Sequence, residues 1–293
     1  MASNVRIVTD STARFEDPGI VEDYDLTVVP VELRFGSQTL RDGVDIDAEE
    51  VFHRLRHDDD RFTVAPPTQE AFETVFQALS KTTDQICVLL HSQGLTSAFI
   101  HAQAARAGLL GRCDISVIDS QTTSLGLGYL VEEVAKVAAN GATLEDSIRV
   151  SRSVIPRIYS IYYVDSLDYI QQAGLIGETQ AILGRMLNIK PMLTIEDGKL
   201  IVMEKVRTHS QAIDKMVEFV SEFTHLERAG ILQSSLRVTE RTRMLQDRLA
   251  LALSRIHYPI TLYESLVASL LGPDAMGMAV LEGADGDELE PFD

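Results

Sequence analysis

Three segments of the sequence place hydroxyl, carboxylate or glycine residues directly after apolar runs of strand length. They read Thr9-Asp10-Ser11-Thr12, His91-Ser92-Gln93-Gly94, and Asp119-Ser120 followed by Ser124, Gly126 and Gly128. Taken singly, each segment is more typical of residues that cap the next helix. In an open parallel sheet, the carboxyl ends of the strands meet at one edge, where ligands bind. Hydroxyls and free amides at such an edge could hold an anion such as a carboxylate.

Two aspartates and two histidines are the candidates for acid–base chemistry. Asp10 and Asp119 each close a predicted strand and could act as a carboxylate pair, although hydrogen bonds that fix loops are the commoner role. His91 and His101 could each serve as a base or a ligand, but their spacing matches no metal site. An ordinary structural role is therefore favoured for both histidines.

The common catalytic motifs are absent from the sequence. It contains no HExxH, CxxC, Walker, GxGxxG or GxSxG pattern, so the metalloprotease, zinc, nucleotide and hydrolase classes lose their usual support. The two cysteines, Cys87 and Cys113, are too few for a disulfide framework or a thiolate cluster, and no metal site is predicted. Gly126 and Gly128 could admit either a ligand or a neighbouring helix at close range, and both interpretations stay open.

Composition and charge limit the class of protein. The chain has 293 residues, of which 45% are hydrophobic and 24% charged, and this favours two folded domains over a disordered chain. With 26 basic against 44 acidic residues, its formal charge of -18 repels phosphate backbones, so no nucleic-acid partner is expected. No apolar run approaches the ~18 residues that span a bilayer, which predicts no stable membrane insertion. Residues 1–12 lack a secretory pattern, and a cytoplasmic location is expected.

The first half alternates predicted strands with predicted helices. Its apolar runs predict buried strands over residues 5–8, 26–33, 86–90 and 115–118. Helices are expected from a capping box at Asp47 and Glu50 to His57, from Thr68 to Lys81, and over residues 124–139 and 143–154. This alternation predicts a three-layer α/β/α domain with a parallel sheet over residues 1–156.

The second half changes character near Pro156. Residues 158–164 alternate like a half-buried strand, and the segment 196–199 (EDGK) joins two strands as a hairpin. Helices are expected over residues 211–223 and 240–253, with strands near Ile231 and Thr261 and over residues 278–281. We expect a two-layer α/β domain with a mixed sheet over residues 157–282, followed by an acidic tail over residues 283–293.

Apolar residues are dense in this second half. In the segment 177–194, near-helical spacing favours an ordinary core face formed by Ile182, Leu183, Met186, Leu187 and Ile189. The alternative is a flexible apolar wall that lines a lipid tunnel, to which further methionines would contribute. Those methionines are Met192, Met203, Met276 and Met278.

The order of several motifs resembles the DegV family of bacterial fatty-acid-binding proteins. The matching segments are residues 5–12 (VRIVTDST), 28–31 (VVPV), 42–46 (DGVDI), 117–120 (VIDS), 124–128 (SLGLG), 167–170 (LDYI), 187–191 (LNIKP), 196–199 (EDGK), 205–207 (KVR) and 272–273 (GP). Each motif is weak singly, but they occur in family order across almost the entire chain. The ordered set is therefore specific.

The resemblance implies a two-domain α/β protein that buries one long-chain fatty acid in an apolar tunnel between its domains. In that family the acyl chain is presented to a separate fatty acid kinase, which makes an acyl phosphate for phospholipid synthesis, and the carrier is not the enzyme. Thr63, Ser92 and Gln93 are then expected to bind the carboxylate. Further residues expected to line the ligand are His91, Thr96, Ser124, Gly126, Leu270 and Met186. No cofactor is expected besides the bound fatty acid.

The chain departs from the family pattern near the head of the ligand. Leu270 stands where the family has a histidine, and Leu175 stands where it has an arginine. The carboxylate would then rely on Thr63, Ser92, backbone amides or His91. One lost hydrogen bond to a charged group weakens binding by about 1.5–3 kcal/mol. Burial of an acyl chain at ~0.8 kcal/mol per CH₂ still favours a lipid ligand.

Two other classes of function stay open at this point. One is an enzyme acting on a small acyl or phosphorylated substrate, with Asp10 or Asp119 as base and Ser92 as nucleophile. The other is a diverged, lipid-free interaction module. A short polar cleft would favour the enzyme over the carrier.

Overall fold

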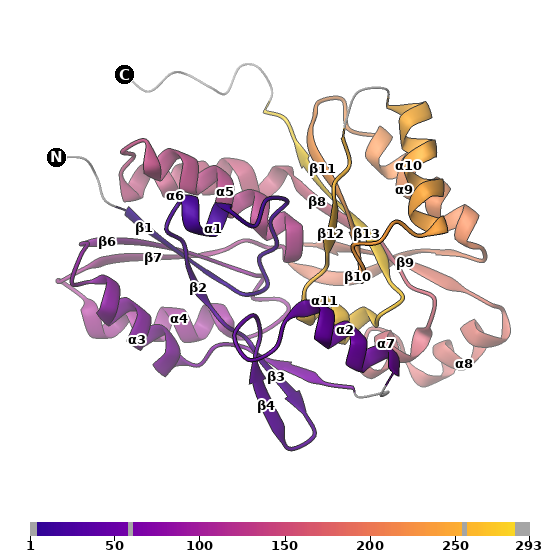
Figure 1. Ribbon diagram of the computed structural model, residues 1–293, viewed down its shortest axis with the longest axis horizontal. Helices are drawn as coiled ribbons and strands as arrows, with labels where there is room; N and C mark the ends of the chain where they lie inside the picture. The colour runs from indigo at the N-terminus through magenta and orange to yellow at the C-terminus, as the bar shows by residue number, and fades with distance from the viewer. Residues whose placement is uncertain (1–4, 58–60, 254–256, 285–293) are drawn as a thin grey trace.

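A computed structural model describes residues 5–57, 61–253 and 257–284. Figure 1 shows two packed halves, one built around a sheet from the indigo and magenta part of the chain and one around a sheet from the pink to yellow part. The acidic segment 285–293 lies outside the described residues.

The first half is a three-layer α/β/α arrangement, as predicted. Its sheet has four parallel strands in the order β2 (Thr27–Val29), β1 (Val5–Asp10), β6 (Gln85–Leu90) and β7 (Asp114–Asp119). Helices α3 (Gln69–Leu79) and α4 (Ala98–Arg106) cover one face, and α5 (Ser124–Ala139) and α6 (Leu144–Val154) cover the other (Figure 1). Because both faces are covered, the central strands are apolar almost throughout.

Alternate residues of these strands serve two separate cores. Val88 packs with Phe72 and Phe76 of α3, whereas Leu89 packs with Leu130 on the α5 side. Since all four strands run the same way, their carboxyl ends lie at one edge of the sheet. The sheet therefore brings together the three segments that follow β1, β6 and β7.

The prediction of one strand over residues 26–33 is wrong. The segment breaks at Pro30, which has no amide proton for a sheet ladder, and the amide of Val31 donates instead to the Ser11 hydroxyl at 3.0 Å. The chain beyond the break enters a separate antiparallel sheet. Its strands are β4 (Gln38–Arg41), β3 (Glu32–Phe35) and β5 (Thr63–Ala65).

The helix starts follow the capping patterns. Asp47 accepts the Glu50 amide at 2.8 Å before α2 (Ala48–His57), and Thr68 accepts the Ala71 amide at 3.2 Å before α3. Thr143 and Asp146 form a capping box at α6. Shorter elements of this half are α1 (Ile20–Asp23) and the 3₁₀ turns η1 (Ala107–Leu109) and η2 (Ile155–Arg157).

The second half contains the predicted mixed sheet. Its strands lie in the order β10 (Lys199–Val206), β9 (Lys190–Glu196), β8 (Ile158–Tyr163), β13 (Met276–Glu282), β11 (Leu226–Gln233) and β12 (Ile260–Leu262). All neighbours are antiparallel except β11 and β12. Helices α9 (His209–Ser221) and α10 (Glu240–Ala252) cover one face of this sheet (Figure 1). The boundary between domains at residue 157 stays a prediction.

The methionines do not form a wall toward the other half. Met192, Met276 and Met278 are buried in the core between the six-stranded sheet and helices α9 and α10, and Met203 is 48% exposed. These residues alternate with the ones that face the first half, such as Ala279 and Leu281.

The predicted core face over residues 177–194 is also wrong. Helix α8 (Glu178–Met186) buries Ala181 and Gly184, and Gly184 lies so close to Leu167 that an added Cβ would meet its Cδ1 at 2.6 Å. Because small residues make the contact, the large apolar residues of α8 and the following turn point outward. Those exposed residues are Ile182, Leu183, Met186 and Leu187.

The two halves share one hydrophobic core. Helix α5 of the first half contacts β8 and β13 of the second. Leu125 of α5 lies so close to Gly230 that a Cβ added to Gly230 would lie 2.4 Å from Leu125 Cδ2. Phe52 of α2 packs edge-on against Tyr263 with ring centroids 4.9 Å apart. Two further helices of the second half are α7 (Leu167–Gln172) and α11 (Ser265–Leu271). Helix α11 contacts both α2 and β5.

Gly128 is the tightest contact between α5 and the loop after β1. An added Cβ there would lie 1.7 Å from the Arg14 carbonyl oxygen, which is backbone and cannot rotate away. We expect Gly128→Ala to lower the free energy of unfolding by about 3 kcal/mol or more, measured by urea titration. Gly108→Ala is the matched control because open space surrounds that position. Equal stability of the two variants would contradict this packing.

Candidate functional site

The Asp10 carboxylate lies at the centre of the sheet edge. It is fully buried, and its Oδ1 accepts from the Thr12 amide at 2.9 Å and from the Thr12 hydroxyl at 2.6 Å. Its Oδ2 accepts from the His91 amide at 3.0 Å and lies 2.9 Å from His91 Nδ1. Asp10 therefore joins the loop after β1 to the loop after β6.

His91 continues this hydrogen-bonded chain to Thr96. The imidazole is fully buried, and its Nε2 lies 2.6 Å from the Thr96 hydroxyl oxygen. Burial alone would lower the pKa of His91, but the adjacent Asp10 carboxylate outweighs burial and raises the pKa above its ordinary value. Burial likewise opposes ionisation of Asp10, yet His91 and Thr12 lower the pKa of Asp10. The pair is thus favoured as an ion pair.

Ser92 is buried where the two halves meet. Its hydroxyl donates to the Gly198 carbonyl at 2.6 Å and accepts from the Gly94 amide at 3.0 Å. Gly198 belongs to the turn between β9 and β10 and has a φ of 75°, and an added Cβ would meet Ser92 Oγ at 2.3 Å. These partners of Ser92 include no general base, so the geometry does not favour Ser92 as a nucleophile.

Asp119 fixes loops, as predicted. One of its carboxylate oxygens, Oδ1, accepts from the amides of Gln93 and Gln121, each at 3.1 Å. The Gln93 side chain is exposed. The preferred structural role for both Asp10 and Asp119 is therefore confirmed, and the alternative of a carboxylate pair has no contact between them to support it among the described residues.

The third segment places Ser124 and Gly126 in close backbone contacts. Ser124 has a φ of 56°, and its carbonyl accepts from the Arg14 amide at 3.1 Å. The Ser124 hydroxyl is buried and has no hydrogen-bond partner within the described structure. At Gly126 an added Cβ would lie 2.5 Å from Thr122 Oγ1 and 2.9 Å from Ile158 Cγ2. Ser124 thus contacts the loop after β1, and Gly126 lies against β8.

Glu264 bridges the halves from the other side. This fully buried carboxylate accepts from the Thr123 hydroxyl at 3.1 Å, from the Val267 amide at 3.0 Å and from the Leu266 amide. Burial raises the pKa of Glu264 to about 7, although Arg14 and the two amides favour its charged form. The sequence analysis missed Glu264; the signal was an acidic residue directly before the apolar run of α11.

Three predicted site residues lie apart from this cluster. Thr63 is exposed on β5, opposite Arg34 of β3, and in the described part of the chain no hydrogen bond joins it to the Ser92 loop. Leu270 is half-buried on α11 and packs against the shared core. Met186 is 79% exposed at the end of α8, because that helix packs through its small residues, so it faces solvent rather than an enclosed tunnel.

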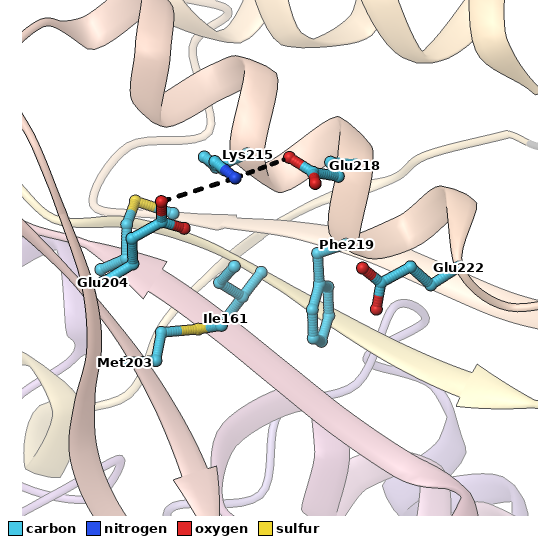
Figure 2. Close-up of a pocket in the computed structure, with 8 residues that line it drawn as sticks. Ile161, Met203, Glu204, Lys215, Glu218, Phe219 and Glu222 are labelled. Carbon is cyan, nitrogen blue, oxygen red and sulfur yellow. Dashed lines mark ion pairs between the residues drawn. The ribbon is translucent and has the colours of Figure 1, made fainter.

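Two hollows flank the sheets. One of about 320 Å³ opens beside Asp10 and Arg14 and is otherwise mostly apolar, with Phe15, Val21 and Val28 among its lining residues. Another of about 120 Å³ lies between β10 and α9, on the face of the six-stranded sheet that α9 covers (Figure 2). There Lys215 forms ion pairs with Glu204 and Glu218 above an apolar floor that includes Ile161 and Phe219.

Within the described ranges, no cluster of three histidine, cysteine or acidic residues is arranged to hold a metal ion. His101 has structural partners, because its Nδ1 lies 2.8 Å from the Pro67 carbonyl and its Nε2 lies 3.3 Å from the Ser97 hydroxyl. None of the described helices has the length and apolar character needed to cross a membrane.

Comparison with known proteins decides the family. The family model whose description reads "Uncharacterised protein, DegV family" matches residues 4–283. The chain belongs to the DegV family. A DegV domain-containing protein of Caldanaerobacter subterraneus is 34% identical over 216 residues, which cover 74% of this chain and 76% of the relative. One from Streptomyces coelicolor is 28% identical over 284 residues, with 96% and 99% covered.

Solved DegV structures share the fold. A fatty acid binding DegV family protein from Streptococcus agalactiae has a TM-score of 0.85 and 21% identity, and the match covers 97% of this chain and 100% of that one. A DegV family protein from Thermus thermophilus, described for its fatty acid binding, has a TM-score of 0.81 and 25% identity, with 95% and 99% covered. The predicted family and the α/β fold with a parallel and a mixed sheet are therefore confirmed.

Proton uptake by Glu264 predicts how stability depends on pH. Because the folded pKa of about 7 exceeds the ordinary value of 4.5, the folded protein holds more protons than the unfolded chain between these values. The free energy of unfolding should therefore fall as pH rises from about 5 to about 8, by about 3 kcal/mol at most. The raised pKa of His91 acts in the same direction above its ordinary 6.5.

Urea unfolding over this pH range measures the effect. Glu264→Gln should flatten the decline below about pH 7, whereas Glu178→Gln, at an exposed position, should leave the decline unchanged. A Glu264→Gln protein with the wild-type pH dependence would show that Glu264 is not the group that titrates.

Proposed function

We propose that this protein binds one long-chain fatty acid between its two halves, with the carboxylate at the sheet edge that carries Ser92. The observation that carries the proposal is the burial of Ser92 against the Gly198 turn, which places its hydroxyl where the two halves meet beside their shared apolar core. Solved DegV proteins with this fold are described as fatty acid binding, and a protein from Eubacterium ventriosum with this fold is described as stearic acid-binding.

Apolar side chains at the seam would contact the acyl chain. Leu95, Ile118 and Ile195 are only partly buried and pack against the core that both halves share. Each lies within a few residues of Ser92, Asp119 or Gly198 in the chain. An acyl chain that covered these side chains would be stabilised by ~0.8 kcal/mol for each CH₂ group that it buries.

The carboxylate would take Thr63, Ser92 and the Gln93 segment as donors. Since the Ser92 hydroxyl donates to Gly198, binding requires that this bond be exchanged for one to the ligand. Thr63 would approach from β5, which contacts α11 of the second half. His91, Thr96, Ser124, Gly126 and Leu270 would lie around the ligand head and the first carbons.

The biological role that we infer is that of a cytoplasmic carrier in phospholipid metabolism. It would present the fatty acid carboxylate to a separate fatty acid kinase and would not itself catalyse a reaction. The Ser92 partners support this inference, because they comprise a carbonyl and an amide rather than a base.

Removing the head-group hydroxyls should weaken binding of palmitate. We expect Ser92→Ala and Thr63→Ala each to raise the Kd for palmitate about tenfold or more, because each removes one hydrogen bond to a charged group. Calorimetric titration measures the change. Ser153→Ala removes an exposed hydroxyl on α6 and is the control. Unchanged affinity in both variants would place the carboxylate elsewhere.

Presentation to a kinase has its own test. With palmitate bound, addition of a bacterial fatty acid kinase and ATP should yield palmitoyl phosphate, detected as its hydroxamate after trapping with hydroxylamine. A panel of such kinases that all fail to act on bound palmitate would contradict the carrier role and leave fatty acid binding standing.

A further inference from the structure

Thr96 carries a hydrogen-bonding arrangement that the proposed function has not used. Its hydroxyl oxygen lies 2.6 Å from His91 Nε2 and accepts from the Ala98 amide at 3.2 Å. Thr96 as a residue is half-buried. The Ser92 hydroxyl, by contrast, already donates its hydrogen bond to the Gly198 carbonyl.

The protonation state of His91 decides where the Thr96 proton points. When the imidazole is neutral and gives its Nδ1 proton to Asp10, Nε2 can only accept, so Thr96 donates to His91. When the imidazole is charged, Nε2 carries a proton and donates to Thr96. Thr96 then receives two donors, from His91 and Ala98, and its own proton is free for another acceptor.

The charges around His91 favour the second state. Carboxylates face it from three elements: Asp10 at the end of β1, Asp119 at the end of β7, and Glu264 before α11. The nearest of them, Asp10, lies 2.9 Å from Nδ1. Arg14 is the cation of this region and acts on Glu264. A buried imidazole with this surrounding is stabilised as the cation.

We propose that Thr96 donates to the carboxylate of the bound fatty acid, and that protonation of His91 sets this donor free. The inference rests on the proposed function and assigns to Thr96 a direct hydrogen bond with the head group. Thr96 lies two residues before the start of α4, a helix of nine residues whose N-cap Ser97 makes no side-chain hydrogen bond to the helix. The positive end of that helix further favours an anion at this position.

Paired measurements of palmitate and hexadecanol affinity against pH test the proposal. In the wild-type protein, palmitate should bind about tenfold or more tightly at pH 6 than at pH 9, because deprotonation of His91 returns the Thr96 proton to Nε2. Hexadecanol has no carboxylate, so its affinity should change less than about twofold. Thr96→Val should bind palmitate with similar affinity at pH 6 and pH 9. Its affinity for hexadecanol should stay that of the wild-type protein.

A control and two contrary outcomes complete the test. Thr74→Val removes an exposed helical hydroxyl on α3 and should keep the wild-type pH profile. Palmitate affinity that is independent of pH, or a Thr96→Val protein that loses palmitate and hexadecanol equally, would overturn the role of Thr96 while fatty acid binding stands. A wild-type protein that binds neither ligand at any pH would overturn the proposed function as well.

Discussion

A buried carboxylate must be satisfied by hydrogen-bond donors, and in this protein the donors to Asp10 organise the edge of the first sheet. Thr12 and His91 supply its hydrogen bonds from two different loops. The loop after β6 is therefore held in one orientation, which turns the Ser92 hydroxyl toward the second half and sets His91 against Thr96. A buried anion that lost one of these partners would be strongly destabilised.

The seam between the halves is as closely fitted as the edge. Gly94 and Gly198 meet so tightly that a Cβ on Gly94 would lie 2.4 Å from the Gly198 carbonyl oxygen. A fatty acid carboxylate therefore cannot simply be added beside Ser92. On the proposed function, it would take over hydrogen bonds that the two halves make with each other, and ligand binding would then be linked to the contact between them.

Local pattern was enough to predict the elements that position the site. The central strands β1 and β6 are buried on both faces and have largely apolar sequences, and the helix starts at Asp47, Thr68 and Thr143 follow from capping chemistry. One wrong prediction overlooked a local signal, and the other arose where helix packing overrides local pattern. Pro30 divides a run that looks like one strand, and helix α8 packs through small residues, so its large apolar side chains face outward.

The site was predictable only in part, for a similar reason. The family resemblance pointed to Ser92 and the loops around it. Nothing in the local sequence indicates that the Ser92 hydroxyl donates a hydrogen bond to the carbonyl of Gly198, 106 residues away. The partnership of Asp10 with His91 likewise depends on two strands being neighbours. Glu264 closes the seam through Thr123 across 141 residues and carried only a helix-capping signal.

Native mass spectrometry of the protein as purified, followed by solvent extraction of whatever it carries, tests the central claim most directly. The account predicts an added mass of about one fatty acid per chain, and a long-chain carboxylic acid in the extract. An empty protein that also fails to take up added palmitate, or a tightly held ligand without a carboxylate, would contradict it.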